Sequence, residues 1–263
     1  MIFGPIPLPL SPMKTLLNTL RSELADRADP AWKAGAERYF KEPVQFYGLS
    51  NSVARKIGGE YHKQLKGLTK DEILALCEEL MRTGLMEETI IACDWSNRLH
   101  RQFEPGDFAT FERWISQYVN NWAACDTLCN HTVAEFIVKY PVHLADLKRF
   151  AQSENRWMRR AAAVTLIIPA ARGKFLADVF EIATLLLHDP DDLVRKGYGW
   201  MLKAAAESHR QEVFEFVLRH KATMPRTALR YAIEKMPGEM KAEAMSIKSP
   251  DVNEIPTINK SIL

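Results

Sequence analysis

The sequence predicts an all-α protein, and three observations lead to this prediction. Apolar residues recur at helical spacing through most of the 263-residue chain. No segment shows the alternation of apolar and polar residues that half-buried strands have. Short polar breaks, such as residues 188–192 and 222–225, separate the helical segments. The pattern of helix, short turn and helix is therefore repeated along the chain.

The best-marked helix is expected over residues 69–84. Thr69 and Glu72 have the spacing of a capping box, in which each side chain binds the backbone N–H of the other residue. Gly84 suits the end of the helix, because glycine adopts the left-handed conformation found there. The apolar stripe between these ends consists of Ile73, Leu76, Cys77 and Leu80.

Further amphipathic helices are expected along the rest of the chain. One begins at Asp107, which we expect to be its N-cap because a carboxylate accepts hydrogen bonds from the first free N–H groups of a helix. Three more are expected over residues 143–153, 175–188 and 210–220.

Two segments of the chain match each other after a shift of 36 residues, when 157–166 is set over 193–202. The matched pairs are Arg159 with Arg195, Arg160 with Lys196, and Leu166 with Leu202. Each segment follows a helix and a short polar turn. Repeated two-helix units are typical of an α-solenoid, in which neighbouring units bury each other's apolar faces. We therefore expect helical repeats with a concave face.

The domain organisation that we expect is a single helical domain over residues 13–245. Residues 1–12 contain four prolines and are set apart as a Pro-rich N-terminal extension, which is a poor secretory signal. Residues 246–263 have little apolar periodicity and are expected to form a disordered tail. No apolar run is long enough to cross a bilayer, so no membrane partner is expected. The four cysteines form no C-x-x-C pair, which favours a reducing cytosol.

Charge is distributed unevenly along the chain. Residues 139–230 contain 16 Lys and Arg against 10 Asp and Glu, whereas the net charge of the whole chain is only +2. A basic half beside an acidic half is a hint of a polyanionic partner. An unevenly charged solvated surface explains this observation equally well.

Five residues are candidates for one functional surface. Trp122 and Asp126 are four residues apart and therefore share a helix face. Arg160 follows Asp126 by 34 residues, Lys196 follows Arg160 by 36, and Trp200 is one helical turn further on. Residues about one repeat apart point into the same groove of a solenoid. We expect these five side chains to line it together.

Each of these candidates also has a purely structural interpretation. Tryptophans at helical spacing usually belong to the core, and we assign Trp32, Trp95, Trp114 and Trp157 to packing. The Asp126 carboxylate is flanked by apolar residues and is costly to bury without a partner. It either meets a cation or lies open in a groove, and one of the arginines at 156, 159 and 160 is a possible structural partner.

A metal site is the sharpest alternative for this stretch of the chain. Cys125, Asp126, Cys129 and His131 lie within seven residues. On a helix, however, Cys125 and Cys129 share a face, while Asp126 and His131 point elsewhere, and no second ligand cluster with zinc-like spacing exists. Buried cysteines are the favoured interpretation, so no metal is expected. The chain also lacks a P-loop and a Gly-rich dinucleotide turn, which leaves most cofactor enzymes without support.

Five motifs follow one another in the order of a known family. They are the segment at 36–57 with its Tyr-Gly-Leu turn, W-x-x-x-D at Trp122 and Asp126, W-x-x-R at Trp157 and Arg160, G-W-x-L from Gly199 to Leu202, and the segment at 224–237. Over residues 33–240 the chain resembles the AlkD-like DNA alkylation repair proteins. These are DNA glycosylases built from HEAT-like helical repeats.

The resemblance implies a HEAT-like α-solenoid whose concave face binds duplex DNA. It implies that Asp126 is the catalytic carboxylate, with Trp122 and Trp200 as aromatic walls beside the lesion nucleotide. Arg160 would hold the DNA backbone, and Arg159, Lys196 and Lys203 are the further cations that we expect at DNA. The family excises cationic N-alkylated purines, such as 3-methyladenine and 7-methylguanine, in base excision repair. It uses no metal, no cofactor and no lyase lysine. We expect a monomer in the bacterial cytosol or nucleoid.

The chain departs from the family pattern at three positions. Asp192 and Leu193 stand where well-known members carry aromatic residues, and Lys203 stands where an arginine is common. These departures affect the grip on DNA rather than the proposed chemistry. Some relatives lack the glycosylase residues and bind branched DNA, so the alternative is a non-catalytic HEAT-like protein that binds branched or damaged DNA. A solenoid that binds only proteins is the second alternative.

Overall fold

The computed structural model describes residues 10–246, and within them the chain is helical apart from its turns and one isolated β-bridge between Gln45 and Leu85. The all-α prediction is confirmed. The α-helices are α1 (Leu10–Asp26), α2 (Pro30–Glu37), α3 (Asn51–His62), α4 (Lys70–Met81), α5 (Met86–Arg98), α6 (Asp107–Gln117), α7 (Trp122–Thr127), α8 (Ala134–Lys139), α9 (Leu144–Phe150), α10 (Arg156–Val164), α11 (Ile167–Ala171), α12 (Leu176–Leu185), α13 (Asp192–Ala205), α14 (Arg210–His220), α15 (Arg226–Ala232) and α16 (Gly238–Met245). A π-helix, η3 (Leu128–Val133), joins α7 to α8, and short 3₁₀ helices are η1 (Lys63–Leu65), η2 (His100–Gln102) and η4 (Pro141–His143).

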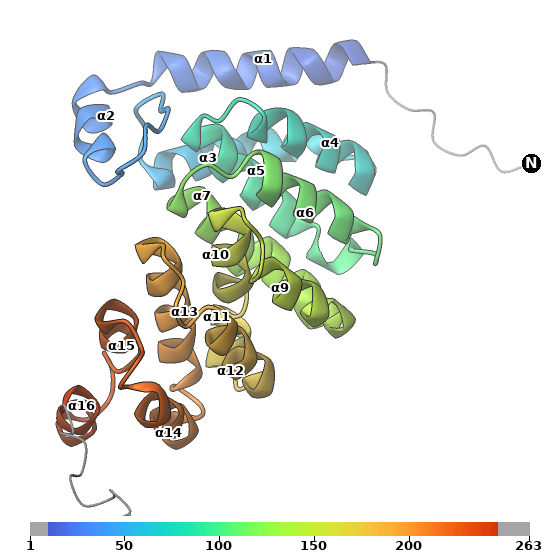
Figure 1. Cartoon of the computed structure of the whole chain (residues 1–263). Coiled ribbons are helices and arrows are strands. Elements are labelled where there is room, and N and C mark those ends of the chain that lie inside the picture. The colour runs from blue at the N-terminus through green and yellow to red at the C-terminus, as the bar shows by residue number, and fades with distance from the viewer. Residues whose placement is uncertain (1–9, 247–263) are drawn as a thin grey trace, which may run out of the picture.

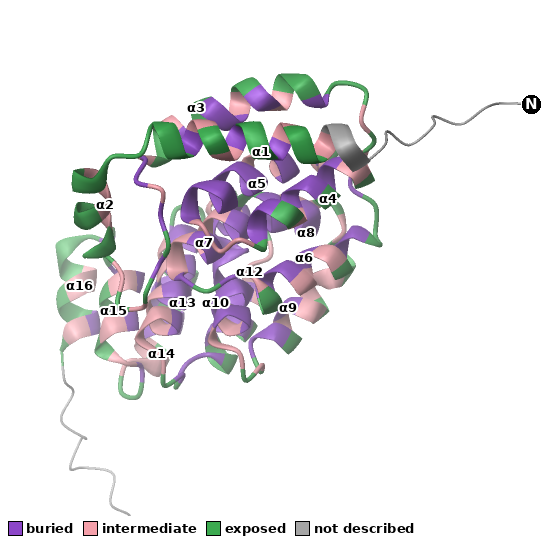
Figure 2. Ribbon diagram, turned by 90° about the horizontal axis from the view of Figure 1, so that it is seen from above, coloured by how far each residue is buried: buried purple, intermediate pink, exposed green. Residues whose placement is uncertain are grey.

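The helices are stacked in an arc that runs from α1 at one end to α14, α15 and α16 at the other (Figure 1). One row of helices consists of α7, α10, α13 and α15, each of which packs against the next. Helices α9 and α12 pack behind α10 and α13. The buried residues concentrate on helices enclosed on several sides, such as α5 and α10, whereas α1 and α2 expose much of their surface (Figure 2).

The two segments that match after a shift of 36 residues make the same local contact. Arg159 on α10 donates from Nη1 to the carbonyl of Ser153, at 2.9 Å. Arg195 on α13 donates from Nε to the carbonyl of Asp189, which again lies six residues earlier. The equivalence therefore extends from sequence to hydrogen bonding. The assignment to HEAT-like repeats stays a prediction.

The ends of the chain differ in part from their prediction. Helix α1 begins at Leu10, inside the Pro-rich segment 1–12. Pro12 is tolerated there because the first turn of a helix has N–H groups without carbonyl partners, so a missing N–H costs nothing. Residues 1–9 of that extension lie outside the described residues. The tail predicted over 246–263 also lies outside them, apart from Ser246.

The helix signals read from the sequence are correct at one helix and shifted at another. The capping box of Thr69 and Glu72 is present at the start of α4, and Gly84 has a φ of 69° after its end. Asp107 is not the N-cap of α6, which is Gly106. Its carboxylate instead closes the preceding turn, by accepting the backbone N–H of Glu104 at 2.8 Å.

The Tyr-Gly-Leu turn before α3 is held by a buried carboxylate. Glu87, in the first turn of α5, is completely buried. It accepts the backbone N–H groups of Tyr47, Gly48 and Leu49 at 3.0, 2.9 and 2.8 Å. Three such bonds satisfy a charge that would otherwise be costly to bury. The turn is thereby fixed to a helix some 40 positions later in the chain.

A second buried carboxylate and a glycine complete this anchor. Glu88 accepts the Tyr47 hydroxyl at 2.7 Å and pairs with Arg21 of α1 at 3.1 Å. Gly48 has a φ of 123°, and a Cβ at this position would lie 2.6 Å from the carbonyl oxygen of Asp29. Only glycine fits this turn. The segment from residue 38 to residue 50, which we call the α2–α3 segment, is therefore firmly positioned.

Candidate functional site

Asp126 and Arg160 form a two-pronged ion pair between α7 and α10. Asn121 caps α7 by accepting the backbone N–H of Ala124 at 2.9 Å, so the helix begins at Trp122 and presents Asp126 one turn later. Arg160 donates from Nε to Oδ1 and from Nη2 to Oδ2 of Asp126, both at 2.8 Å. Arg160 also donates from Nη1 to the carbonyl of Leu193. Of the three candidate arginines, Arg160 is thus the partner of the carboxylate.

Burial and pairing act on the carboxylate in opposite directions. The side chain of Arg160 is 5 % exposed and that of Asp126 is 13 % exposed. Burial raises the pKa of Asp126 above its usual range, and the guanidinium of Arg160 offsets part of this rise because it favours the ionised form. The pair is therefore mostly, but not entirely, withdrawn from water.

The exposed part of Asp126 faces a cavity of about 430 Å³. The walls come from α7, α10, α13, α15 and the α2–α3 segment. The lining residues are Tyr39, Lys41, Glu42, Trp122, Asp126, Arg160, Leu193, Lys196, Trp200, Lys203 and Tyr231. The five residues that the spacing places on one surface do lie together here. Their roles in binding or catalysis stay predictions.

Arg159 does not line this cavity. Its Nε donates to Oδ2 of Asp189 at 2.6 Å, and both side chains are largely buried. Consecutive residues on a helix point about 100° apart, so Arg159 and Arg160 face different neighbours. The structure therefore gives Arg159 a packing contact and leaves its predicted DNA contact without support.

Two of the three lysines that line the cavity, Lys196 and Lys203, are paired with carboxylates. Lys196 binds Asp192 at 2.8 Å, one turn away on α13. Lys203 binds Glu234 at 2.9 Å and lies over the ring of Tyr231. The departures from the family pattern are thus part of the site. Asp192 neutralises one cation of the cavity, and the Leu193 carbonyl accepts Arg160.

Four lining residues were missed by the sequence reasoning, namely Tyr39, Lys41, Glu42 and Tyr231. All four lie inside the two segments, 36–57 and 224–237, that carry the family resemblance. Glu42 pairs with Arg156 of α10 at 2.8 Å, which ties the α2–α3 segment across the cavity. Phe40 stacks on Trp122 with ring centroids 5.3 Å apart and planes at 19°. One face of Trp122 is thereby covered.

The glycine of the G-W-x-L motif allows two helices to approach closely. A Cβ on Gly199 would lie 2.7 Å from Cβ of Tyr231 and 2.8 Å from the carbonyl oxygen of Ala228. No larger residue fits without moving α15 from α13. This close approach places Tyr231 and Trp200 on the same cavity.

The cysteines beside Asp126 are core residues. Cys125 and Cys129 are completely buried, and the Cys125 thiol donates to the carbonyl of Trp157 at 3.6 Å. Between residues 10 and 246, no three His, Cys, Asp or Glu side chains are grouped so that they could hold a metal ion. In the same part of the chain, no helix is both long and apolar enough to cross a membrane.

The fold and the site define a class of protein, namely an all-helical protein in which a carboxylate–guanidinium pair and two tryptophans line one cavity. The model of the family of DNA alkylation repair enzymes matches residues 20–236, and the chain belongs to this family. The resemblance drawn from the motifs is confirmed. The structure is similar to that of a protein from Enterococcus faecalis described as a predicted DNA alkylation repair enzyme, with a TM-score of 0.71 and 16% identity over 80% of this chain and 97% of that chain. At this identity the likeness shows the fold alone. No curated protein matches the chain.

Proposed function

We propose that this protein is a monofunctional DNA glycosylase that acts on cationic N-alkylated purines in duplex DNA. Its substrates would be lesions such as 3-methyladenine and 7-methylguanine, and its reaction is hydrolysis of the N-glycosidic bond. The observation that carries the proposal is the Asp126 carboxylate, which is held by Arg160 and faces a cavity with Trp122 and Trp200 in its walls. Membership of the DNA alkylation repair enzyme family supports DNA as the substrate.

The chemistry asks little of the protein beyond electrostatics. A cationic alkylpurine leaves without being protonated, and positive charge develops on the deoxyribose as the bond breaks. The open face of Trp122 and the ring of Trp200 carry negative quadrupole density that favours this cation. The ionised Asp126 stabilises it more strongly and orients the attacking water.

Arg160 orients the Asp126 carboxylate and, in this proposal, also binds DNA. A guanidinium has five N–H groups, and three of them are used on Asp126 and the Leu193 carbonyl. We assign the remaining two to a backbone phosphate, which a guanidinium recognises well. Lys196 and Lys203 would exchange their carboxylate partners for phosphates.

The experiment that tests the proposal measures free base released from methylated duplex DNA. We expect Asp126→Asn to abolish release while most DNA binding is kept, and Trp200→Ala to slow release. Asp126→Asn leaves the buried Arg160 without its partner, a loss that costs about 3–5 kcal/mol. The double variant Asp126→Asn/Arg160→Gln removes both charges and is the control for folding. Normal release by Asp126→Asn would refute the mechanism.

A second candidate is a non-catalytic protein that binds branched or damaged DNA. One observation favours it, because both oxygens of Asp126 are occupied by Arg160, as they are in a purely structural ion pair. Binding of such DNA by the wild-type protein, with no base release and no effect of Asp126→Asn on binding, would select this candidate.

A further inference from the structure

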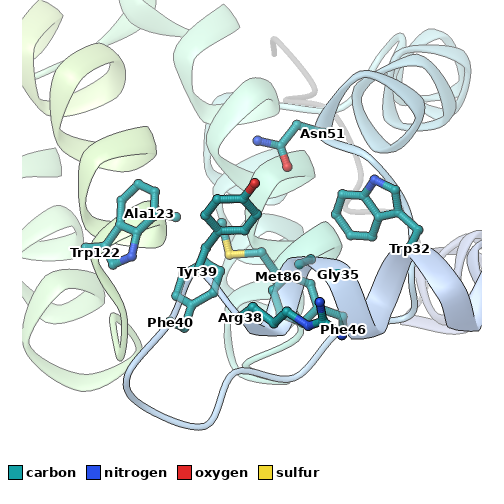
Figure 3. Close-up of a pocket in the computed structure, with 11 residues that line it drawn as sticks. Trp32, Gly35, Arg38, Tyr39, Phe40, Phe46, Asn51, Met86, Trp122 and Ala123 are labelled. Carbon is teal, nitrogen blue, oxygen red and sulfur yellow. The ribbon is translucent and has the colours of Figure 1, made fainter.

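A second cavity lies beside the one that contains Asp126. Its volume is about 550 Å³, and it is formed by α2, the α2–α3 segment and the N-terminal parts of α3, α5 and α7. Tyr39 and Trp122 belong to both cavities. In Figure 3 Tyr39 lies between Trp122 on one side and Trp32 on the other. Nothing in the chemistry proposed above uses this second cavity.

Aromatic residues make up five of the eleven that line the second cavity, namely Trp32, Tyr39, Phe40, Phe46 and Trp122. Trp32 packs edge-on against Phe46, with ring centroids 6.1 Å apart and planes at 76°. Met86 adds a polarisable sulfur, which packs well against rings. Tyr39 is 79 % exposed although it is a large aromatic residue. Such an exposed ring beside an open aromatic pocket is suited to receiving a flat ligand.

Two polar side chains at this cavity are not engaged elsewhere. Within residues 10–246, neither the amide of Asn51 nor the guanidinium of Arg38 has a side-chain hydrogen bond or ion pair. By contrast, Arg156, Arg159 and Arg160 are all paired. Figure 3 shows the Asn51 amide on the same side as the Tyr39 hydroxyl. An amide both donates and accepts, as the edge of a nucleobase does, and a guanidinium binds phosphate.

We infer that the second cavity takes a nucleobase of the bound DNA that has left the stack next to the lesion nucleotide. This inference rests on the proposed function, because it requires DNA at Asp126. We identify the occupant as part of the bound DNA because the second cavity is continuous with the first. DNA seated in the first cavity reaches the second across the shared Tyr39 and Trp122. Stacking on aromatic side chains then offsets the cost of unstacking the base. The base is held here for grip on the DNA, and the lesion itself stays at Asp126.

The test is photocrosslinking with 5-iodouracil in a duplex that carries a tetrahydrofuran abasic analogue. The iodinated base is placed at either position that flanks the abasic site, and crosslinked peptides of the full-length protein are mapped by mass spectrometry. We expect at least one position to crosslink to Trp32 or Phe46, which line the second cavity only. Crosslinks confined to residues outside the second cavity, or none from any position, would overturn the inference.

Substitution of Trp32 gives an independent readout. Trp32→Leu removes the stacking wall, and we expect it to weaken binding of the abasic duplex about tenfold. Binding of an undamaged duplex, whose bases stay stacked, is expected to change less than about twofold. Trp32→Phe keeps an aromatic wall and is expected to restore most of the affinity. Equal loss for both duplexes, or no rescue by Trp32→Phe, would contradict a base-stacking role. Thermal unfolding of each variant establishes that it is folded.

Parallel measurement of base release separates this inference from the proposed function. Release by the wild-type protein without crosslinks to Trp32 or Phe46 would support the glycosylase and refute the base-binding role of the second cavity. Crosslinks to Trp32 without any base release would support the base-binding role and show that the protein binds DNA but is not a glycosylase. An absence of binding to either duplex would remove both.

Discussion

At the scale of single residues, the site depends on whether Asp126 is ionised in its buried pair with Arg160. Asp126 is withdrawn from water and would be protonated readily if it were alone. Arg160 opposes this protonation with two hydrogen bonds and its positive charge. In the proposed mechanism this ionised carboxylate, held in one orientation by Arg160, stabilises the sugar cation. A rigid, poorly solvated charge stabilises a transition state better than a hydrated one does.

This balance predicts a pH dependence of base release. In the proposed mechanism release requires ionised Asp126, so the rate should fall as pH falls through the pKa of this group. Because burial raises that pKa above 3.8, the fall occurs at a higher pH than it would for an exposed aspartate. Arg160→Gln removes the cation that lowers the pKa, so the acidic limb should move further toward neutral pH. The measurement is the single-turnover rate of 7-methylguanine release between about pH 4 and pH 8, with the enzyme-free rate subtracted.

Arg160→Lys is the control for this experiment. It keeps a positive charge near Asp126 but loses the two-pronged geometry, so its acidic limb should move less than that of Arg160→Gln. Identical pH profiles for the wild-type protein and Arg160→Gln would show that Asp126 is not the group whose ionisation limits the rate.

At the scale of elements, the α2–α3 segment is the part of the site that depends most on distant residues. It contributes Tyr39, Lys41 and Glu42 to the first cavity. It is held at one end by Glu87 on α5 and tied to α10 through Glu42 and Arg156. Loss of this anchor should therefore affect both stability and the site.

We predict that Glu87→Gln lowers the free energy of unfolding by about 3 kcal/mol, because three charge-assisted bonds to backbone N–H groups are lost or weakened in a buried place. The rate of base release should fall as well, because the α2–α3 segment, which lines the cavity, loses its anchor. Urea unfolding and base release measure the two effects. Glu60→Gln is the matched control, since Glu60 is exposed and pairs only with Lys63, and it should change neither quantity. Unchanged stability of Glu87→Gln would refute the anchor.

Two glycines on α13 should respond oppositely to the same substitution. Gly199→Ala places a methyl group 2.7 Å from Cβ of Tyr231, so we expect it to cost about 2 kcal/mol and to slow base release as Tyr231 and Trp200 move. A Cβ on Gly197 would meet side-chain atoms of Arg160 and Val164 at 3.5 Å, which is ordinary van der Waals contact. Gly197→Ala should stabilise the helix by about 0.5–1 kcal/mol. Urea unfolding of both variants checks the pair, and equal effects of the two substitutions would contradict the packing described here.

At the scale of the whole molecule, the cavity is lined by residues of α7, α10, α13 and α15. These helices form one row, and α9 and α12 pack behind that row (Figure 1). Three of the cations in the cavity, Arg160, Lys196 and Lys203, are already paired in the free protein. DNA bound there as proposed would compete with their carboxylate partners. The affinity for undamaged duplex should therefore be modest and strongly dependent on salt.

The salt dependence can be assigned to individual residues. Lys196→Gln and Lys203→Gln should each make the slope of log K against log salt shallower by about 1, which corresponds to one phosphate contact. Lys148→Gln is the control, because Lys148 on α9 pairs with Asp178 and Glu181 of α12, behind the cavity. Fluorescence anisotropy with an undamaged duplex gives the slopes. An equal change for Lys148→Gln would place the DNA elsewhere on the molecule.

Local sequence signals predicted the features that depend only on residues within one helix. The capping box at Thr69 and the shared face of Trp122 and Asp126 follow from helix geometry alone. The spacings of 34 and 36 residues were enough to predict that Asp126, Arg160 and Lys196 lie together. The sequence does not show which of two adjacent arginines faces the cavity, and the structure places Arg160 there and pairs Arg159 with Asp189.

The parts that the sequence did not predict depend on long-range contacts. The place of the α2–α3 segment is set by Glu87, some 40 positions away, and by the stacking of Phe40 on Trp122. Nothing within the segment itself indicates these partners, so Tyr39 and Glu42 were missed. The shift at Asp107 has the same origin, because its carboxylate bonds back to Glu104 and also binds Lys70 of α4.

The measurement that tests the central claim most directly is the amount of 7-methylguanine and 3-methyladenine released from methylated duplex DNA under single-turnover conditions. It compares the wild-type protein, Asp126→Asn and the folding control Asp126→Asn/Arg160→Gln. We predict release by the wild-type protein, and a fall of at least about 100-fold in both variants, because an electrostatic group aimed at the developing charge contributes that much or more. Release by Asp126→Asn at the wild-type rate, or no release by the wild-type protein despite intact duplex binding, would contradict the assignment of Asp126 as the catalytic carboxylate.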